Sequence, residues 1–347
     1  MSEVLYRKYR PQTFADVVGQ EHVTGVLSAQ VVSKNISHAY LFAGTRGTGK
    51  TSVARIFARA LGTSTNDLYE IDAASNTSVD DIRALNESVH TLPFDSVYKI
   101  YILDEVHMLS KSASNALLKT LEEPPAHVIF ILATTETHKI PETVMSRCEV
   151  YTFKKPSQDV LKRVVINIIK KEGSTIDEQS ADLIALLGDG SFRDTQGIIQ
   201  KVLSFAKTKK ITEEEVRCVT GAPAVTLIHD LFEAIAGGDT AGALSVVHTA
   251  TSQNIDMLVF LKLILHSMRT ILLARAGAVE IIAGDLSPEE KKFVTGLSSN
   301  PIFSSKTLVE LLTAYENTQG SYIPSLPLEL AVITIIDTES GKESKKV

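Results

Sequence analysis

Cysteine is scarce in this chain of 347 residues. Only Cys148 and Cys218 are present, and no two cysteines have the CxxC spacing. A disulfide framework needs several cysteines, and a zinc knuckle needs closely spaced pairs. The sequence carries the signature of neither.

The chain also lacks the apolar segments that secretion and membrane insertion require. The N-terminal segment MSEVLYRKYRPQ has basic residues but no apolar core of a signal peptide. The most apolar stretch, residues 257–276, is interrupted by Lys262, His266, Arg269 and Arg275, which argues against a membrane span. We therefore expect a cytoplasmic protein that has no membrane partner.

A strong excess of positive charge is absent as well. The 35 basic and 41 acidic residues give a net charge of −6. This excludes a chain coated in basic charge but not a local basic patch, so nucleic acid remains a possible partner. The composition, with 44% hydrophobic and 22% charged residues, is that of a globular protein, and the length predicts two or three domains.

Short apolar runs alternate with helical patterns in the first part of the chain. The runs cover residues 39–43, 68–72, 99–103, 128–133 and 150–153. Several consist almost entirely of Val, Ile, Leu, Phe and Tyr, as in strands that are covered on both faces. The alternation predicts an α/β domain with a parallel five-stranded sheet.

The pattern changes after Lys155 and Pro156, where only helices are expected. We predict an α/β domain over residues 1–155, a small helical domain over 156–221, a larger all-helical domain over 222–338, and a flexible polar tail over 339–347. The breaks between helices of the third domain are expected at Gly237-Gly238, Gly284, residues 298–301 and residues 320–327.

The strongest motif is GTRGTGKT at residues 44–51, which fits the phosphate-binding pattern G-x-x-x-x-G-K-[ST] between a strand and a helix. Its glycines allow successive N–H groups to point at phosphate oxygens, and the helix N-terminus favours negative charge. Lys50 is expected to reach the β- and γ-phosphates, and Thr51 to bind Mg²⁺. The predicted ATP contacts of this loop are Gly44, Thr45, Arg46, Gly47, Thr48, Gly49, Lys50, Thr51 and Ser52.

A second motif, KIYILDE at residues 99–105, ends an apolar strand in two carboxylates. Ligands of parallel sheets gather at the carboxyl ends of the strands. Asp104 would face the Mg²⁺ held by Thr51, and Glu105 would orient and polarise the attacking water. Because one carboxylate suffices for the metal, the pair indicates ATP hydrolysis; the alternative is a solvated acidic turn.

Three further positions carry weaker signals. A hydroxyl at Thr134 or Thr135, where a predicted strand ends, could bind the γ-phosphate or the attacking water, although β-branched residues are common in strands. Arg147 could enter a neighbouring subunit's ATP site, and Arg193 could reach the phosphates from the start of a helix. Both could equally be surface arginines.

These motifs belong to a longer ordered pattern. It comprises LYRKYRPQTFADVVGQEHV from residue 5, HAYLFAGTRGTGKTSVARIFARAL from residue 38, EIDAASN from residue 70, YILDEVHMLS and ALLKTLEEPP between residues 101 and 125, LATT from residue 132 and SRC from residue 146. The pattern resembles the gamma/tau subunits of bacterial DNA polymerase III, which are AAA+ ATPases. The resemblance is strong over residues 1–221 and weaker beyond, where IPSLPLELAVITI at residues 323–335 carries it.

The resemblance implies a P-loop AAA+ domain, a helical lid and a C-terminal helical collar for oligomerisation. It also implies the function of such subunits, which drive the clamp loader with ATP and place the beta sliding clamp on primed DNA during replication. The implied partners are the delta and delta-prime subunits, further copies of the chain, the beta clamp, and primed DNA bound without sequence preference. DNA synthesis itself would reside in another subunit.

The resemblance also assigns roles to single residues. Lys50 and Thr51 become the Walker A pair, and Asp104 and Glu105 become Walker B. The remaining assignments are Thr135 as sensor 1, Arg193 as sensor 2, Arg147 as the finger that acts in trans, and Tyr9, Arg10, Pro11 and Val18 as the adenine-side segment. Lys119 and Lys139 match positions that face DNA phosphates, although a solvated surface explains them equally well.

Two departures from the family pattern are visible. Family members usually carry a cysteine-rich zinc module after the Walker A helix, whereas residues 61–68 read LGTSTNDL, so we predict no zinc. The long form of the family continues beyond the collar, whereas this chain ends at Val347. We therefore expect either a short gamma-like form or a truncation.

Three other interpretations remain. A DNA translocase of the Holliday-junction branch-migration type would have a similar ATP site, but its C-terminal domain is usually a winged helix, and the third domain here is predicted to be helical. A non-hydrolysing scaffold subunit of the clamp loader is disfavoured by the intact GKT and DE residues. A small archaeal or eukaryotic clamp-loader subunit is disfavoured by EIDAASN and TLEEPP.

Overall fold

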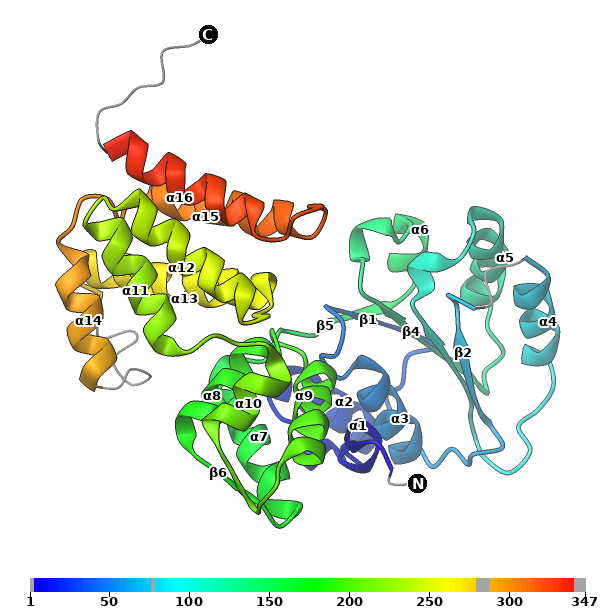
Figure 1. Ribbon diagram of the computed structural model, residues 1–347. Helices are drawn as coiled ribbons and strands as arrows, with labels where there is room; N and C mark the ends of the chain where they lie inside the picture. The colour runs from blue at the N-terminus through cyan, green and yellow to red at the C-terminus, as the bar shows by residue number, and fades with distance from the viewer. Residues whose placement is uncertain (1–2, 76–78, 279–287, 340–347) are drawn as a thin grey trace, which may run out of the picture. The chain divides into compact units, whose positions relative to one another are not determined.

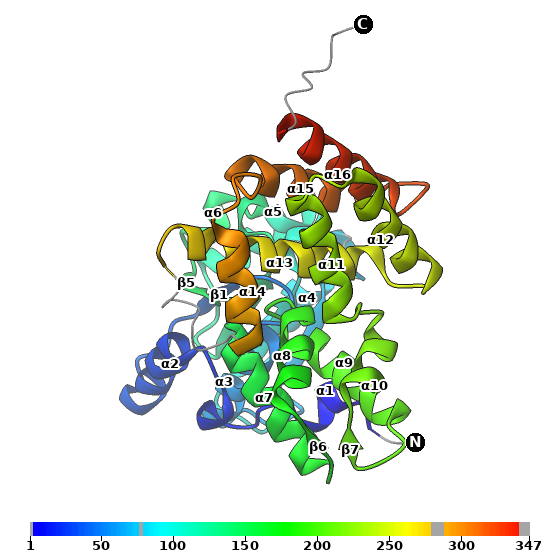
Figure 2. The same cartoon turned by 60° about the vertical axis from the view of Figure 1, so that its left-hand side comes forward.

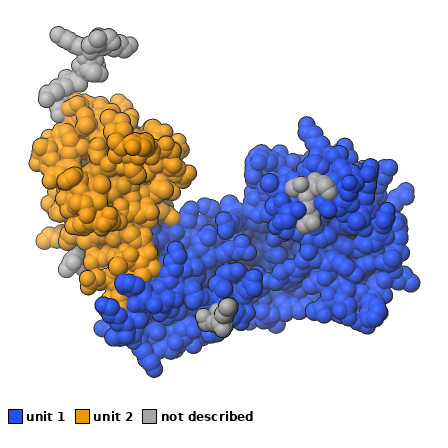
Figure 3. Space-filling view, turned by 45° about the vertical axis from the view of Figure 1, so that its right-hand side comes forward, with its two compact units in different colours: residues 1–211 blue, residues 212–347 orange. Residues whose placement is uncertain are grey.

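The computed structural model describes residues 3–75, 79–278 and 288–339 (Figure 1). The chain forms two compact units, Met1–Ile211 and Thr212–Val347 (Figure 3). Two features expected from the sequence, the helix break at Gly284 and the tail at 340–347, lie outside the described residues.

The first unit contains a parallel sheet of five strands in the order β2-β3-β4-β1-β5. The strands are β1 (Ala39–Ala43), β2 (Leu68–Asp72), β3 (Lys99–Asp104), β4 (Val128–Thr134) and β5 (Glu149–Thr152). The register pairs Ala43 with Thr134 and Asp72 with Asp104, so the strands end at a common edge. The predicted five-stranded parallel sheet is confirmed, and no predicted strand boundary is off by more than one residue.

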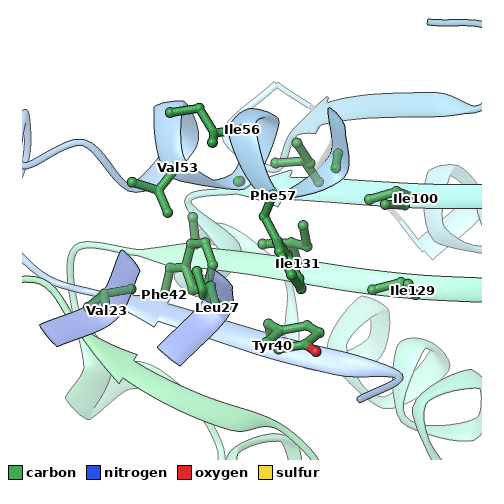
Figure 4. Close-up of a cluster of buried hydrophobic side chains, with 14 of the residues drawn as sticks. Val23, Leu27, Tyr40, Phe42, Val53, Ile56, Phe57, Ile100, Ile129 and Ile131 are labelled. Atoms are coloured by element: carbon green, nitrogen blue, oxygen red, sulfur yellow. The ribbon is translucent and has the colours of Figure 1, made fainter. Parts of the chain in front are cut away.

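Helices cover both faces of this sheet, which explains why its strands are apolar throughout. On one face, α2 (Glu21–Ser33) and α3 (Lys50–Ala60) pack on Tyr40 and Phe42. On the other face, α4 (Val79–Val89) and α5 (Lys111–Glu122) pack on Leu41. Figure 4 shows the first cluster, in which Phe57 of α3 points toward the sheet and meets Tyr40 edge to face with ring centroids 4.9 Å apart. Each such buried side chain contributes about 1.5–3 kcal/mol, and together they fix α3 over the strands.

Short elements precede the sheet or connect its later strands. They are α1 (Leu5–Lys8), the 3₁₀ turns η1 (Phe14–Asp16), η2 (Val106–Met108) and η3 (Thr137–Lys139), and α6 (Glu142–Met145). Helix α1 lies beside a helix much later in the chain, α9 (Phe192–Phe205) (Figure 1). Leu5 is buried there, and its N–H donates to Gln200 Oε1 at 3.0 Å. The N-terminal segment is therefore anchored beside the site described below.

A helical bundle follows the sheet in the same unit. It consists of α7 (Gln158–Lys171), α8 (Glu178–Leu187) and α9. Each helix begins at a capping side chain, since Ser157, Asp177 and Ser191 accept a hydrogen bond from the backbone N–H three residues later. A parallel pair of two-residue strands, β6 (Thr175–Ile176) and β7 (Lys210–Ile211), was not expected from the sequence.

The regular elements in the described residues of the second unit are all helices (Figure 2). Its helices are α10 (Glu213–Thr220), α11 (Val225–Ala236), α12 (Thr240–Ser252), α13 (Met257–Arg275), α14 (Pro288–Ser298), α15 (Ser305–Thr318) and α16 (Leu326–Glu339). The units divide at 211/212, so α10 falls in the second unit, ten residues before the predicted start of the third domain at 222. The domain boundaries at 155 and 221 remain predictions.

Helix α13 is long and apolar enough to span a membrane by length and composition. The sequence argument against a span is therefore weaker than expected, because Arg275 stands at the very end of the helix and leaves few charges within it. The structure places α13 among the other helices of the second unit, with eight of its side chains, including Phe260, Ile264 and Met268, buried. One such helix is weak evidence for a membrane span, because the core helix of a soluble protein passes the same test.

Candidate nucleotide-binding site

The loop between β1 and α3 has a shape that three glycines permit. Gly47 and Gly49 adopt φ values of 75° and 103°, in the left-handed region that favours glycine. A Cβ on Gly44 would lie 2.5 Å from the carbonyl oxygen of Phe153, and one on Gly47 would lie 2.0 Å from Ser191 Oγ. The close approach of the chain on both sides therefore excludes larger residues at positions 44 and 47.

Lys50, the first residue of α3, folds back over this loop. Its Nζ donates to the carbonyl oxygens of Gly44 at 2.7 Å and Thr45 at 3.0 Å, and only 6% of the residue is exposed. Burial lowers the pKa of Lys50, while the nearby carboxylates of Glu105 and Asp104 oppose that effect. A buried ammonium held at the N-terminal end of a helix is suited to an anionic ligand.

A cavity of about 560 Å³ opens in front of the loop. This size is within the range of small-molecule sites. The predicted residues that line it are Tyr9, Arg10, Pro11, Val18, Arg46, Gly47, Thr48, Gly49, Lys50, Thr51, Ser52, Asp104, Glu105 and Arg193. Gly44 and Thr45 lie behind the cavity, where their carbonyl groups hold Lys50.

Thr51 and Asp104 meet at the edge of the sheet. Thr51 Oγ1 donates to Asp104 Oδ2 at 2.7 Å. Two oxygen ligands this close, together with phosphate oxygens, match what Mg²⁺ takes in nucleotide sites, where protein usually supplies one or two ligands. The described residues contain no group of three or more His, Cys, Asp or Glu side chains placed to hold a metal ion. The absence of zinc stays a prediction.

Glu105 follows Asp104 in a backbone conformation that is rare for residues with a side chain. Its φ is 51°, in the left-handed region. Thr135 donates to Glu105 Oε2 through its hydroxyl at 3.0 Å and through its N–H at 3.3 Å. Thr135 thus contacts the cavity through Glu105 and does not line the cavity itself.

One end of the cavity lies between the N-terminal segment and α7. Tyr9, Pro11 and Val18 line it on one side, and Val164 and Ile168 line it on the other. The α7 residues were not found from the sequence, because their helical spacing indicates an apolar face but not what that face covers. This half-apolar end is suited to a planar base.

A carboxylate outside the cavity fixes Tyr9. The hydroxyl of Tyr9 donates to Glu172 Oε1 at 2.5 Å, and Lys8 Nζ lies 2.7 Å from the same oxygen. Burial and the hydrogen bond to Glu172 both raise the pKa of Tyr9. The phenol is therefore neutral and remains a donor.

The helical bundle contacts the phosphate loop directly. The N–H of Phe192, at the start of α9, donates to the carbonyl oxygen of Gly47 at 2.9 Å. The next residue, Arg193, lines the cavity and lies over the ring of Tyr6 at 5.6 Å from its centroid. The sequence prediction that Arg193 approaches the phosphate side from a helix start is consistent with this placement.

Gln20 links the phosphate loop to the segment that follows β5, and the sequence did not indicate this role. Its side chain is fully buried, donates to the carbonyl oxygen of Lys154 at 2.7 Å and accepts from the N–H of Lys154 at 3.1 Å. The same amide nitrogen lies 3.4 Å from the carbonyl oxygen of Thr48. Nothing in the local pattern of Gln20 indicates these contacts, because its partners lie far along the chain.

Besides Gly44, Thr45 and Thr135, three predicted residues lie outside the cavity. Arg147 pairs with Glu122 at 2.5 Å and donates to the carbonyl oxygen of Thr143 at 2.7 Å. Lys139 pairs with Glu136 at 2.8 Å, and Lys119 is exposed on α5. A role for any of them needs a second molecule.

Comparison with known proteins gives consistent results along the chain. Residues 62–157 match the family model described as DNA polymerase III, delta subunit, and residues 211–346 match DNA polymerase III subunits gamma and tau domain III. The tau subunit of Bacillus subtilis is 36% identical over 97% of this chain and 63% of its own length. The tau subunit of Escherichia coli is 36% identical over 79% of this chain and 46% of its own length. This chain therefore spans about half to two thirds of these relatives.

Solved structures agree on the fold. The Holliday junction branch migration motor RuvB of Thermotoga maritima superimposes with a TM-score of 0.53 at 21% identity, over 65% of this chain and 79% of that one. At this identity the likeness shows the fold alone. It confirms the expected AAA+ arrangement of a parallel sheet followed by helices.

Proposed function

The chain belongs to the gamma/tau subunit family of bacterial DNA polymerase III, and from this premise we propose that it is an ATP-hydrolysing motor subunit of a clamp loader. In this role it loads the beta sliding clamp onto primed DNA during replication in the cytoplasm. The observation that carries the proposal is the convergence of Lys50, Thr51, Asp104 and Glu105 on one cavity in front of the glycine-containing loop. Membership alone does not require this, since a scaffold subunit can keep the fold without these groups.

The chemistry assigned to each residue follows from its position. The loop N–H groups and Lys50 hold the triphosphate of ATP, whose base lies toward Tyr9 and Ile168. Thr51 and Asp104 would hold Mg²⁺, which neutralises charge on the phosphates. Glu105, held by Thr135, orients a water molecule and accepts its proton. Arg193 contacts the phosphates from the helical bundle, so the nucleotide state affects the position of that bundle.

Hydrolysis in this proposal needs a neighbouring subunit. Arg147 is partly exposed, with 32% of its side chain accessible, and lies outside its own cavity. It would enter the ATP site of the next subunit and stabilise the transition-state charge there. Glu122 holds it in place within its own chain.

The second unit has a surface suited to oligomerisation. Val309, Leu312 and Leu330 on α15 and α16 are each more than 40% exposed, and the turn between these helices exposes Tyr322 and Ile323. Several exposed apolar side chains on neighbouring helices are typical of protein interfaces. We assign this surface to the collar, which would join copies of the chain to the delta and delta-prime subunits.

Primed DNA is the proposed trigger for hydrolysis. Lys119 and Lys139 would contact phosphates, which adds affinity without reading sequence. A translocase would carry a different third domain, and the described residues of 212–339 form helices only. The fold likeness to RuvB therefore does not favour branch migration.

The decisive measurement is ATP hydrolysis by the complex reconstituted with delta and delta-prime. Clamp and primed DNA together should stimulate turnover strongly, and the same complex carrying Lys50→Ala should show none. Turnover of the chain alone that rises with duplex DNA and accompanies strand movement would instead select the translocase. Unstimulated turnover in every combination would contradict the clamp-loader role.

A further inference from the structure

Two polar side chains near Glu105, those of His107 and Glu136, have no part in the mechanism above. His107 has only 6% of its side chain exposed, and its ring lies between two carboxylates. Nδ1 is 3.4 Å from Glu105 Oε2, and Nε2 is 3.3 Å from Glu136 Oε1. One imidazole thus connects the carboxylate assigned to water activation with a second carboxylate that does not line the cavity.

The surroundings fix this ring in place. His107 Nδ1 also lies 3.1 Å from Thr134 Oγ1, and the same hydroxyl accepts the N–H of Glu136 at 3.0 Å. Glu136 is paired with Lys139 Nζ at 2.8 Å, and that ammonium lowers the pKa of Glu136. The carboxylate behind the ring is therefore ionised and anchored.

The carboxylate of Glu105 depends on contacts from other residues, because the local backbone does little to hold it in place. Its backbone is in the left-handed region, which costs free energy for a residue with a Cβ, and 31% of its side chain is exposed. The contacts from Thr135 and His107 both reach Oε2. Neither contact uses the other carboxylate oxygen, Oε1, which in the proposed role is left to accept from water.

We propose that His107 is a positioning residue for ATP hydrolysis, which fixes the carboxylate of Glu105 by bracing it against Glu136. This rests on the proposed role of Glu105. Loss of the brace lets the carboxylate rotate, and a displacement of about 1 Å at a reacting group costs about 100-fold in rate. Nucleotide binding depends on the loop and Lys50, which His107 does not contact, so it is unaffected.

The test uses the chain assembled with delta and delta-prime, clamp and primed DNA. His107→Ala should lower the single-turnover rate of ATP hydrolysis about 100-fold and leave the affinity for a fluorescent ATP analogue within about twofold of the unmodified chain. Glu136→Ala, which leaves the ring itself intact, should lower the rate in the same direction. His90→Ala, at an exposed histidine after α4, should change neither quantity.

A double-substitution cycle separates positioning from a general structural effect. In a Glu105→Gln background, His107→Ala should have no further effect on the rate, because the carboxylate that it positions is gone. Equal losses in both backgrounds, a parallel loss of nucleotide affinity, or full activity of His107→Ala would overturn the inference. Full activity of Glu105→Gln alone would instead overturn the proposed function.

Discussion

The hydroxyl of Thr51 donates a hydrogen bond to Asp104 Oδ2 at 2.7 Å across 53 residues of sequence. Thr51 belongs to the first turn of α3, and Asp104 is the last residue of β3. The contact exists because α3 packs over the sheet through Val53, Ile56 and Phe57, which sets the start of the helix beside the strand end. The apolar core thus determines the distance between the two proposed magnesium ligands.

Removal of the Thr51 hydroxyl tests the proposed magnesium site. Thr51→Ala should weaken magnesium-dependent ATP binding about tenfold or more, because one hard oxygen ligand is lost. Thr51→Ser keeps the oxygen and should bind like the unmodified chain. Calorimetric titration with ATP, with and without magnesium, measures both. Equal affinities of the alanine and serine variants in magnesium would show that the hydroxyl is not a ligand.

Lys50→Ala should abolish nucleotide binding in the purified chain. The substitution removes the only ammonium that lines the phosphate end of the cavity among the loop residues 44–52. The control is Lys201→Ala, which removes an exposed lysine of α9. Binding of a fluorescent ATP analogue is the measurement, and retained affinity in Lys50→Ala would contradict the assignment of the cavity.

Arg147→Ala should separate binding from hydrolysis. The affinity for ATP should stay unchanged, because Arg147 lies outside the cavity of its own chain. Hydrolysis by the assembled complex should fall about 10³-fold, the magnitude typical of a finger arginine. Arg83→Ala, which removes another exposed arginine, is the matched control. A loss of ATP binding as large as that caused by Lys50→Ala would refute an action in trans.

Gly47→Ala should destabilise the first unit by more than its backbone angle explains. The new Cβ would lie 2.0 Å from Ser191 Oγ, whereas a Cβ on Gly62, at a similar positive φ, would meet open space. The Gly62→Ala control therefore measures the cost of the backbone alone, about 1–2 kcal/mol. Urea unfolding should show an extra loss of about 1 kcal/mol or more for Gly47→Ala. Equal losses of stability in Gly47→Ala and Gly62→Ala would mean that the phosphate loop accommodates the new Cβ without strain.

Asp67 should make stability depend on acid pH. Burial disfavours its carboxylate, but hydrogen bonds from the N–H groups of Phe94, Asp95 and Ser96 outweigh this and lower the pKa to about 2. A carboxylate whose folded-state pKa is depressed stabilises the fold above its unfolded pKa of about 3.8, and the effect is lost as pH falls toward 2.

The melting temperature of Asp67→Asn should therefore lie below that of the unmodified chain at pH 7. The difference in melting temperature between the two proteins should become smaller as pH falls from 5 toward 2. Asp80→Asn, at an exposed carboxylate of α4, is the control and should follow the unmodified chain. A gap that stays constant over this range would show that the charge of Asp67 is not what holds the loop at residues 94–96.

The sequence predicted the sheet well because its strands are buried on both faces. Such strands are continuous apolar runs, and the phosphate loop and the Asp104–Glu105 pair are local patterns at their ends. The two-residue strands β6 and β7 are too short to give a pattern. The division of the chain at 211/212 was also not visible, since α10 has the same helical composition as its neighbours on both sides.

The residues of the site that the sequence did not predict are those whose contacts lie far along the chain. The links of Gln20 to Lys154 and of His107 to Glu136 depend on how the sheet brings strand ends together, and no spacing in the sequence reports them. Val164 and Ile168 have the helical spacing of an apolar face, which does not indicate that they line a cavity. The roles of Arg147, Lys119 and Lys139 remain predictions, because each requires a second molecule.

The hydrogen bond from the Phe192 N–H to the Gly47 carbonyl oxygen has a mechanical consequence. Any rotation of α9 away from the sheet must either break this bond or pull the peptide of Gly47 along with it. A movement of α9 and a change in the shape of the phosphate loop are therefore coupled. The coupling passes from backbone to backbone, without an intervening side chain.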